Sequence, residues 1–533
     1  MKIDYLHIRS GFKNVQDLEI EFDNRQLLTV LIGRNGSGKS NVIEALVRIF
    51  RALDFGDEPA PFSYKLGYSL GASQGRRIEV DASPEYGSTP IQQHKIQVST
   101  LGESGQYSLP ESISLSKVTR DKEGNSDYLP KHLFAYYSGP SDRLEDLFKP
   151  HRTKFYNQLL KNQVKIEDEV RPLFYAKPFH SQFVLLAFFL NQQKGIGREF
   201  LEDHLGITAF HSVHFVFRRP TEWSSINKKD LFWGAKGVVR EFLNRLLPHS
   251  LGAIKAEREE STSLTGRGKN NEFVHLFLPD LYSLKKVAQG LGAKNFFKML
   301  ESTLLSDLLS SVHIKVRLKN GEVVSFSELS EGEQQLLTVL GLLEFTVEED
   351  SLFLLDEPDT HLNPAWAAKY HSFLKRFIPD KRFCHILMVT HHPLAIAELN
   401  KEQIQVLRKD ADGQSLAQTP LESPIGMGVN GILTSDMFDM ATTLDQHTSK
   451  VIEDRRRILE KDTLTEAEVR RLNELNDSLD RLGYSYIHPD EDYRQFLIAR
   501  KKAMQQMEAE NKDSTEYRLK LINAILKDQG LIE

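Results

Sequence analysis

Apolar residues at the start of the chain have the spacing of β-strands. Residues 3–8 form an apolar-rich segment, and apolar residues alternate with polar ones from 18 to 22. A continuous apolar run follows at 27–32, as in a strand buried on both faces, and residues 41–50 have the composition of a helix. This pattern predicts a short β-meander, followed by a buried strand that leads into a helix.

Three later segments extend the strand pattern. Turn residues cluster between short β-like pieces from 54 to 127, and the next apolar strand is predicted at 133–137. Short apolar runs at 352–355 and 386–389 have the composition of buried strands in a parallel sheet. We therefore predict an α/β fold in which a β-meander and a mainly parallel sheet are flanked by helices.

A segment with helical character separates the two halves of this fold. Within residues 144–311, apolar residues have helical spacing at 183–190 and 238–247. The segment has no sustained heptads, so it is predicted to be a globular helical insertion and not a coiled-coil arm. Alternating residues from 314 to 318 and the Asn320-Gly321 turn signal then predict a hairpin that leads into the second half.

The last part of the chain is predicted to be a charged helical region. From His447 onward it contains 16 Lys and Arg residues and 18 Asp and Glu residues. Thr465 and Glu468 form a capping box, and the helix is expected to end at Gly483. Its apolar stripe would pack on the parent domain or bind a partner. The predicted domains are thus 1–143, 144–311, 312–445 and 446–533.

Composition narrows the possible functions. The 533 residues are 40% hydrophobic and 27% charged, with a net charge of −6, which excludes a uniformly basic nucleic-acid binder but leaves room for a local basic groove. Cys384 is the single cysteine, so disulfides and a cysteine metal site are excluded. The longest apolar stretch is too short to span a bilayer, and the expected location is the cytoplasm.

A phosphate-binding loop lies between the predicted strand and the first helix. The segment GRNGSGKS, from Gly33 to Ser40, fits the pattern G-x-x-x-x-G-K-[ST] and lies between a strand and a helix, as a phosphate-binding loop does. The alternative is a glycine-rich turn that binds no ligand, but such a turn does not require the Gly-Lys-Ser sequence. Lys39, expected to be a solvent-facing cation, would contact the β- and γ-phosphates, and the Ser40 hydroxyl would bind Mg²⁺. The predicted ATP-binding residues are Gly33, Arg34, Asn35, Gly36, Ser37, Gly38, Lys39, Ser40 and Asn41.

Carboxylates and a histidine follow the later predicted strands. Asp356 and Glu357 end one strand, and His391 follows the next. At the carboxyl ends of parallel strands such side chains lie where ligands bind. Asp356 would complete the Mg²⁺ site and Glu357 would polarise the attacking water, while His391 would donate to the γ-phosphate or be an ordinary loop residue.

The segment LSEGEQ, from Leu329, precedes a helix with apolar residues between 336 and 343. Ser330 and Glu333 form a capping box, which is the structural interpretation. The functional interpretation is that the Ser330 hydroxyl and the Gly332 backbone donate to a γ-phosphate that another subunit binds. Both interpretations are compatible, because a helix N-terminus is an anion site.

As a set, these motifs resemble the branch of ABC-type ATPases that includes SMC proteins, RecF and OLD-type ATPases. The resemblance covers residues 1–50 and 312–400, and it implies an ABC-type ATPase head. The signature departs from the usual LSGGQ, because Glu331 and Glu333 stand where glycine and glutamine are usual. Two carboxylates near a γ-phosphate are expected to slow hydrolysis, because like charges repel. PDTHLNP after Glu357 is the form seen in non-transporter ATPases.

The whole layout more closely resembles the PtuA-type ATPases of Septu and retron-associated anti-phage defence systems. The supporting segments are YYSGPSDR from Tyr136, LSEGEQQ, LLDEPDTHLNP, THHP and GMGVNGILTSDMF. The resemblance implies a homodimer or higher oligomer with composite ATP sites, and an HNH nuclease subunit (PtuB-like) as partner. In retron versions it also implies a reverse transcriptase with its DNA/RNA product.

Other functions remain as alternatives. A transporter ATP-binding subunit would have a much shorter stretch between the phosphate loop and the signature. An OLD/RecF/SMC-like ATPase would act directly on DNA in repair or be an intrinsic nuclease. The nuclease would need a metal site, for which Asp410 and Asp412 are the candidates unless they form a turn. The segment most suited to nucleic-acid binding is 215–240, where six basic residues are interleaved with aromatic ones. The alternative is that these aromatic side chains belong to the core.

Overall fold

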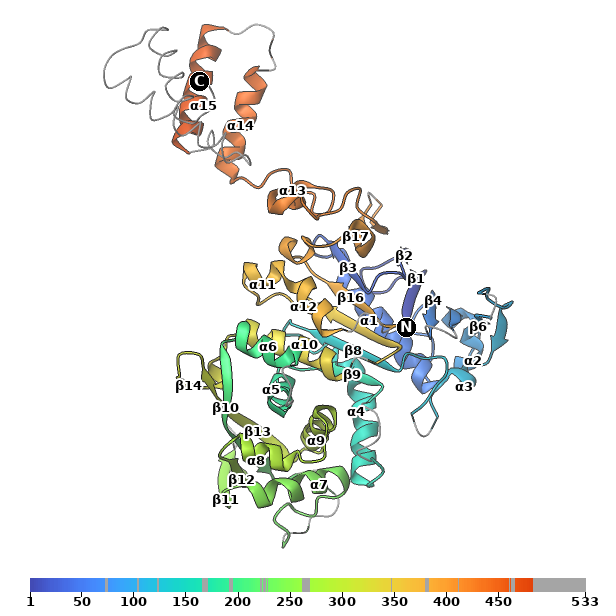
Figure 1. The fold of residues 1–533 in the computed structure, drawn as a ribbon. Helices are drawn as coiled ribbons and strands as arrows, with labels where there is room; N and C mark the ends of the chain where they lie inside the picture. Colours follow the sequence, from blue (N-terminus) through green and yellow to red (C-terminus); the bar gives the residue numbers. More distant parts are fainter. Residues whose placement is uncertain are drawn as a thin grey trace. The chain divides into compact units, whose positions relative to one another are not determined.

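The computed structural model divides the chain into two compact units, Met1–Asp439 and Met440–Glu533. It describes residues 1–482 except 72–74, 103–104, 122–123, 165–170, 191–194, 221–222, 224–226, 228, 261–268, 347, 379–382, 411, 460 and 462–464. In these described residues no helix is long and apolar enough to cross a membrane. Figure 1 shows the course of the chain.

A seven-stranded sheet forms the centre of the first unit. Its order is β18 (Ser415–Gln418), β17 (Ile404–Lys409), β3 (Leu28–Gly33), β16 (His385–Val389), β15 (Ser351–Asp356), β8 (His132–Tyr137) and β9 (Leu173–Ala176). The pairs are parallel except β17 with β18. This confirms the predicted mainly parallel sheet and aligns the ends of β3, β15 and β16.

Helices bury both faces of the central sheet. Leu31, Leu354 and Leu387 pack with α1 (Lys39–Phe55) on one face. The residues that alternate with them, such as Val30 and Phe353, share the core of the other face with α5 (His180–Leu190), α10 (Glu331–Thr346) and α12 (Tyr370–Phe377). Continuous apolar runs therefore predicted these strands well, since both faces are buried.

The predicted β-meander is one edge of a six-stranded antiparallel sheet. The order is β2 (Leu18–Glu21), β1 (Lys2–Ile8), β4 (Tyr64–Leu70), β5 (Arg76–Ala82), β6 (His94–Thr100) and β7 (Glu111–Ile113). The short helix α2 (Pro90–Gln93) lies between β5 and β6, and α3 (Leu115–Val118) follows β7. The sheet shares a core with α1 and so supports the helix that follows the phosphate loop.

The segment predicted to be helical also contains a sheet. Its helices are α4 (Glu145–Leu160), α5, α6 (Ile196–Asp203), α7 (Gly237–Leu246), α8 (Leu281–Val287) and α9 (Ala293–Leu305). The strands β10 (Ile207–Arg218), β11 (Ala253–Glu260) and β12 (Lys269–Leu278) join the predicted hairpin, β13 (Leu309–Leu318) and β14 (Val323–Ser325), in the order β11-β12-β10-β13-β14. Register shifts interrupt the alternation along β10, so its sequence lacks a clean strand period.

The second unit contains a helix pair, α14 (Gln446–Leu459) and α15 (Glu466–Arg481). Val451 of α14 packs against Leu475 and Leu479 of α15. The capping box is present, because Thr465 Oγ1 accepts from the backbone N–H of Glu468 at 3.3 Å and Glu468 accepts from that of Thr465 at 2.9 Å. The predicted helix end at Gly483 and the rest of the tail lie outside the described residues.

Candidate functional site

The phosphate loop joins β3 to α1, and its glycines are required by geometry. Gly36 and Gly38 have φ angles of 81° and 103°, which strain any residue with a side chain. A Cβ on Gly38 would lie 2.6 Å from the Val15 side chain, and one on Gly33 would lie 2.2 Å from the Leu407 carbonyl oxygen. The sequence pattern therefore predicted this loop correctly.

The loop fits a phosphate-bearing ligand. The hydroxyl of Ser37 is buried and has no hydrogen-bond partner within the described part of the chain. Such a buried donor, together with the N–H groups at the start of α1, matches the needs of an anion. Asn14, which the sequence reasoning missed, supports the loop by donating to the Gly36 carbonyl at 2.6 Å and by contacting Asn41.

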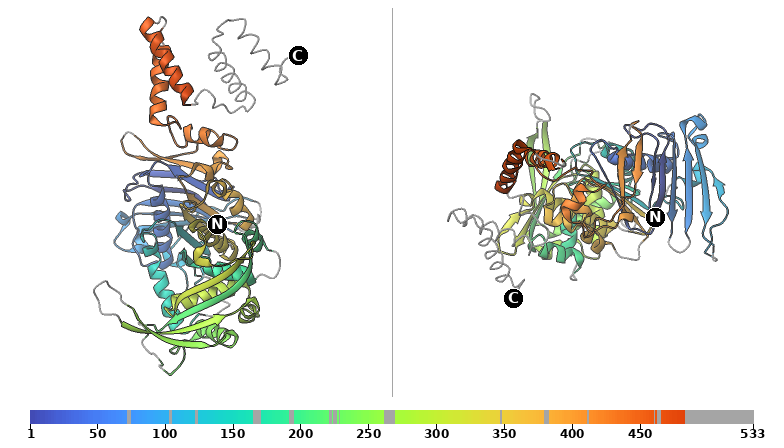
Figure 2. Two further views of the ribbon diagram at one scale, coloured as in Figure 1. Left: turned by 90° about the vertical axis from the view of Figure 1, so that its left-hand side faces the viewer. Right: turned by 90° about the horizontal axis from the view of Figure 1, so that it is seen from above.

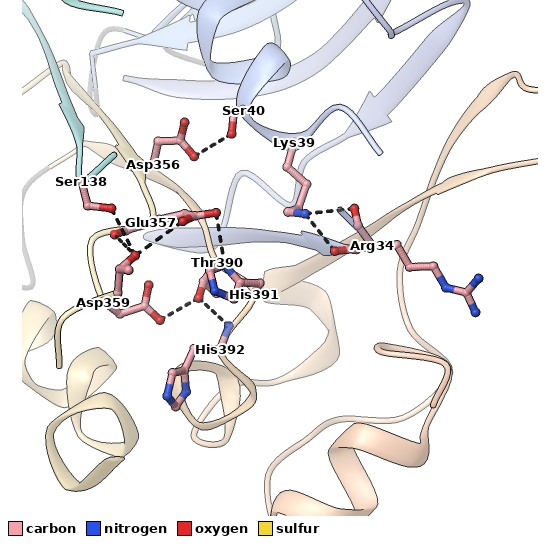
Figure 3. Close-up of polar contacts among 12 residues, drawn as sticks. Arg34, Lys39, Ser40, Ser138, Asp356, Glu357, Asp359, Thr390, His391 and His392 are labelled. Atoms are coloured by element: carbon pink, nitrogen blue, oxygen red, sulfur yellow. Dashed lines mark hydrogen bonds and ion pairs between the residues drawn. The ribbon is translucent and has the colours of Figure 1, made fainter. Parts of the chain in front are cut away.

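Lys39 lies inside the loop, and the expectation that it is solvent-facing is wrong. Its side chain is buried, because Nζ donates to the carbonyl oxygens of Gly33 at 2.8 Å and Arg34 at 3.2 Å. Burial lowers the Lys39 pKa, and the charges of Glu357 and Asp356 partly offset this effect. Figure 3 shows the ammonium group held by the loop backbone. Lys39 thus shapes the loop in addition to offering a charge.

Ser40 and Asp356, the two residues predicted to bind Mg²⁺, lie side by side. The Ser40 hydroxyl donates to Asp356 Oδ1 at 3.0 Å, across the ends of α1 and β15 (Figure 3). Burial raises the pKa of Asp356 to about 6, although the hydrogen bond from Ser40 and the Arg143 charge act in the opposite direction. A hydroxyl and a carboxylate are the oxygen ligands that Mg²⁺ prefers, so these residues fit that ion.

Arg143 is a site residue that the sequence reasoning did not identify. The loop after β8 brings its guanidinium to 3.2 Å from Asp356 Oδ2 and 4.9 Å from the centre of the Tyr137 ring. This is the SGPSDR loop, which follows Tyr137. The available signal was a cation in the loop after β8, a strand that ends beside Asp356.

Glu357 and His391 meet at the ends of β15 and β16. Glu357 Oε1 lies 3.1 Å from His391 Nδ1, and the Glu357 N–H donates to the Val389 carbonyl at 2.9 Å. Glu357 has a φ angle of 54°, an uncommon conformation for a residue with a side chain, which is typical of functional sites. Next to the pair, the Thr390 hydroxyl donates to Asp359 at 2.6 Å, and burial raises the pKa of Asp359 to about 6.

The signature residues lie on a helix that is bound to the loop after Asp356. Ser330 and Glu333 form the predicted capping box, with the hydroxyl of Ser330 donating to Glu333 Oε2 at 2.8 Å. A Cβ on Gly332 would lie 2.4 Å from the His361 carbonyl oxygen. Gln335 donates to the Glu357 carbonyl and accepts from the His361 N–H. In the described hydrogen bonds, neither Ser330 nor Gly332 is joined to the phosphate loop of this chain.

Arg34 and Asn35 line a cavity of about 260 Å³ beside the phosphate loop. Residues 406–409 and 437–439 form its other walls. The Arg34 side chain is largely exposed and pairs with Asp439 at 3.0 Å. Arg34 and Asn35 thus lie at the rim of the loop.

Two alternative sites have ordinary structural explanations. Asp410 accepts from the N–H groups of Asp412 at 3.0 Å and Gln414 at 2.7 Å, which makes it a turn residue between β17 and β18. Among the described residues no group of His, Cys, Asp or Glu has the arrangement of a metal site. In the segment 215–240, Phe232 and Trp233 are buried. Three of its arginines form ion pairs: Arg218 with Asp307, Arg219 with Glu272, and Arg240 with Asp230.

The chain has recognisable relatives. Residues 28–397 match the family model described as "AAA domain, putative AbiEii toxin, Type IV TA system". The chain is 22% identical over 430 residues to the Retron Vc95 probable ATPase of Vibrio cholerae serotype O1 biovar El Tor, with 76% of this chain and 73% of that protein covered. It is 27% identical over 161 residues to the Septu protein PtuA of Bacillus mycoides (strain KBAB4), with 28% and 22% covered.

Two solved structures align over most of the chain with low overall similarity. The SMC head domain from Thermotoga maritima is 14% identical, with a TM-score of 0.28, and covers 79% of this chain and 99% of its own. Stu0660 of Streptococcus thermophilus is 12% identical, with a TM-score of 0.26, and covers 93% and 99%. The family model spans the phosphate loop, the carboxylates that end β15 and the histidine after β16, so the chain belongs to this family of AAA-domain proteins and is a relative of the retron and Septu ATPases.

Proposed function

We propose that this chain binds and hydrolyses ATP and is the regulatory subunit of an anti-phage defence complex. The observation that supports the ATP chemistry best is the position of the Glu357–His391 pair beside the Ser40–Asp356 pair, at the aligned ends of β3, β15 and β16. The names of the retron and Septu relatives support the defence role.

The residues have separate tasks in this proposal. The loop N–H groups and the start of α1 bind the phosphates, and Lys39 adds its charge. Ser40 and Asp356 hold Mg²⁺, which neutralises phosphate charge when bound. Glu357 orients the attacking water and accepts its proton. In its charged form, His391 has two N–H donors, one for Glu357 and one for the γ-phosphate.

We propose that two chains form a head-to-tail dimer with two ATP molecules between them. The supporting observation is that Ser330 contacts its own helix and Gly332 lies against the His361 carbonyl, and that no described hydrogen bond joins either residue to the phosphate loop of the same chain. Each signature helix would then complete the site of the other subunit. The Glu331 side chain is 83% exposed, and its charge would oppose a γ-phosphate, so slow turnover is expected.

We further propose that the dimer controls an HNH nuclease partner, with a reverse transcriptase and its DNA/RNA product as further partners in a retron context. The chain alone is then expected to cleave neither DNA nor RNA with Mg²⁺ or Mn²⁺. Cleavage assays on the purified chain, with and without its operon neighbours, measure this. Robust cleavage by the chain alone, lost in the Asp410→Ala/Asp412→Ala double variant, would favour the OLD-type nuclease instead.

Arg143→Ala is expected to lower kcat for ATP hydrolysis roughly 10²-fold, because the variant loses a preorganised cation at the reacting phosphates. Mn²⁺ binding without nucleotide should become tighter, since Asp356 loses a competing positive charge. Phosphate release and electron paramagnetic resonance of Mn²⁺ measure the two effects. Arg152→Ala is the matched control, because Arg152 pairs with Glu145 on α4. An unchanged kcat in Arg143→Ala would rule out its role at the site.

A further inference from the structure

The five-stranded sheet β11-β12-β10-β13-β14 has two different faces. On the inner face, Phe215 and Phe217 belong to the core, and the Phe215 ring contacts that of Phe242 on α7. The helices α7 and α9 lie on this side (Figure 1), and the left view of Figure 2 shows the sheet from its other side, in front of them. Strand register then identifies the side chains of the outer face, because alternate residues point to opposite sides.

Three basic residues of this outer face, Arg258, Lys315 and Arg317, lie beside uncharged cross-strand partners, whereas Arg218 is paired with Asp307. Cross-strand pairs place Arg258 beside Asn271, Lys315 beside Ser212 and Ser325, and Arg317 beside Val323. Among the outward positions whose side chains are described, none is Asp or Glu, although the whole chain has a net charge of −6. Within the same described residues, no ion pair joins Arg258, Lys315 or Arg317 to a carboxylate. The face is therefore a basic patch on an acidic chain, and it suits an anionic partner.

A row of aromatic rings crosses the middle of the same face. His214 on β10 stacks with His275 on β12 at 5.1 Å between ring centres, with Nε2 and Nδ1 3.0 Å apart. His313 on β13 lies on the other side of His214 at 5.6 Å, and Phe277 lies 6.5 Å away. Partial burial and the neighbouring rings lower the pKa of His214, which favours its neutral form. Phe277 is 37% and Ile254 68% exposed, so a planar ligand has access to the row.

We propose that this outer face binds single-stranded nucleic acid. Bases stack on the row formed by His214, His275, His313 and Phe277, while Arg258, Lys315 and Arg317 contact phosphates. Rings on an open sheet with basic residues around them are the means by which sheet surfaces bind unpaired strands. The open face of a sheet offers no projecting helix for the groove of a duplex. An acidic peptide would contact the basic residues but would not stack on the rings. The surface is separate from the ATP site, so its failure would leave the proposed ATPase unaffected.

The test uses the full-length chain without nucleotide and a fluorescent oligothymidylate about 20 nucleotides long, with anisotropy as the measurement. Arg258→Ala/Lys315→Ala/Arg317→Ala is expected to lower affinity at least about tenfold and to reduce the salt slope by roughly 2, since each lost phosphate contact removes about 0.7. Phe277→Ala/His214→Ala is expected to lower affinity roughly tenfold through lost stacking. All changes are at outward positions and should leave thermal unfolding unchanged.

Lys65→Ala/Lys117→Ala/Lys285→Ala is the matched control, because it removes the same charge from exposed residues elsewhere. This control should bind the oligonucleotide like the unmodified chain. Equal binding by the Arg258/Lys315/Arg317 variant, or no binding by the unmodified chain, would overturn the proposal. Tighter binding of a duplex than of the single strand would also overturn the proposal. So would binding of polyglutamate that the Phe277→Ala/His214→Ala variant retains, because the surface would then recognise charge alone.

Discussion

Lys39→Ala is expected to lower ATP affinity at least about 10²-fold, because the loss of charge-assisted contacts to two phosphates costs roughly 3 kcal/mol or more. The same change removes the two hydrogen bonds that Lys39 Nζ donates to the carbonyl oxygens of Gly33 and Arg34. The core is not affected, so the chain should still fold. Titration with a fluorescent ATP analogue measures the affinity, and thermal unfolding without nucleotide measures the fold.

Arg34→Ala is the control for this prediction. Arg34 is a predicted ATP-binding residue of the same loop, but the alanine variant keeps its backbone N–H, and its side chain is 75% exposed and pairs with Asp439 at the surface. Its loss should change ATP affinity by less than about threefold, because a surface ion pair contributes little. If Lys39→Ala binds ATP as tightly as the unmodified chain, the phosphate loop does not have the proposed role.

Sequence patterns predicted several residues that the structure brings together at the candidate site. The phosphate loop, Asp356, Glu357 and His391 each follow directly after an apolar strand that is buried on both faces. Parallel strands align their carboxyl ends, so residues more than 300 positions apart in the sequence come within hydrogen-bond distance, as Ser40 and Asp356 do. The parallel arrangement of the strands was therefore sufficient to predict that these residues lie together, and the conformation of the loops did not have to be known.

Features that depend on tertiary contacts were not predictable in this way. Register shifts hid the strand β10, and Phe232 and Trp233 belong to the core although basic residues surround them in the sequence. Lys39 is buried because its ammonium group donates hydrogen bonds to two backbone carbonyls of the loop. The spacing of residues in the sequence does not predict these hydrogen bonds. Arg143 contacts Asp356 from the loop after β8, and the sequence pattern did not predict the conformation of this loop.

Glu357→Gln is expected to trap the proposed dimer in its ATP-bound form. Glutamine has nearly the same shape and the same strain at a φ angle of 54°, so the loop should keep its geometry. The amide cannot accept a proton from water, and hydrolysis should fall roughly 10²–10⁴-fold. Because ATP is then not consumed, the sandwich persists. Light scattering coupled to size exclusion, with Mg²⁺ and ATP, should show twice the mass of the nucleotide-free chain.

Two further variants distinguish an ATP-dependent dimer from unspecific association of the chains. Glu402→Gln makes the same chemical change at an exposed position away from the site and should remain monomeric under conditions where the unmodified chain is monomeric. Lys39→Ala/Glu357→Gln should not dimerise with ATP, because ATP must be bound before the second signature helix can contact it. If Glu357→Gln with ATP is no more associated than the nucleotide-free chain, the composite-site model is wrong, and Ser330 and Gly332 have only their structural roles.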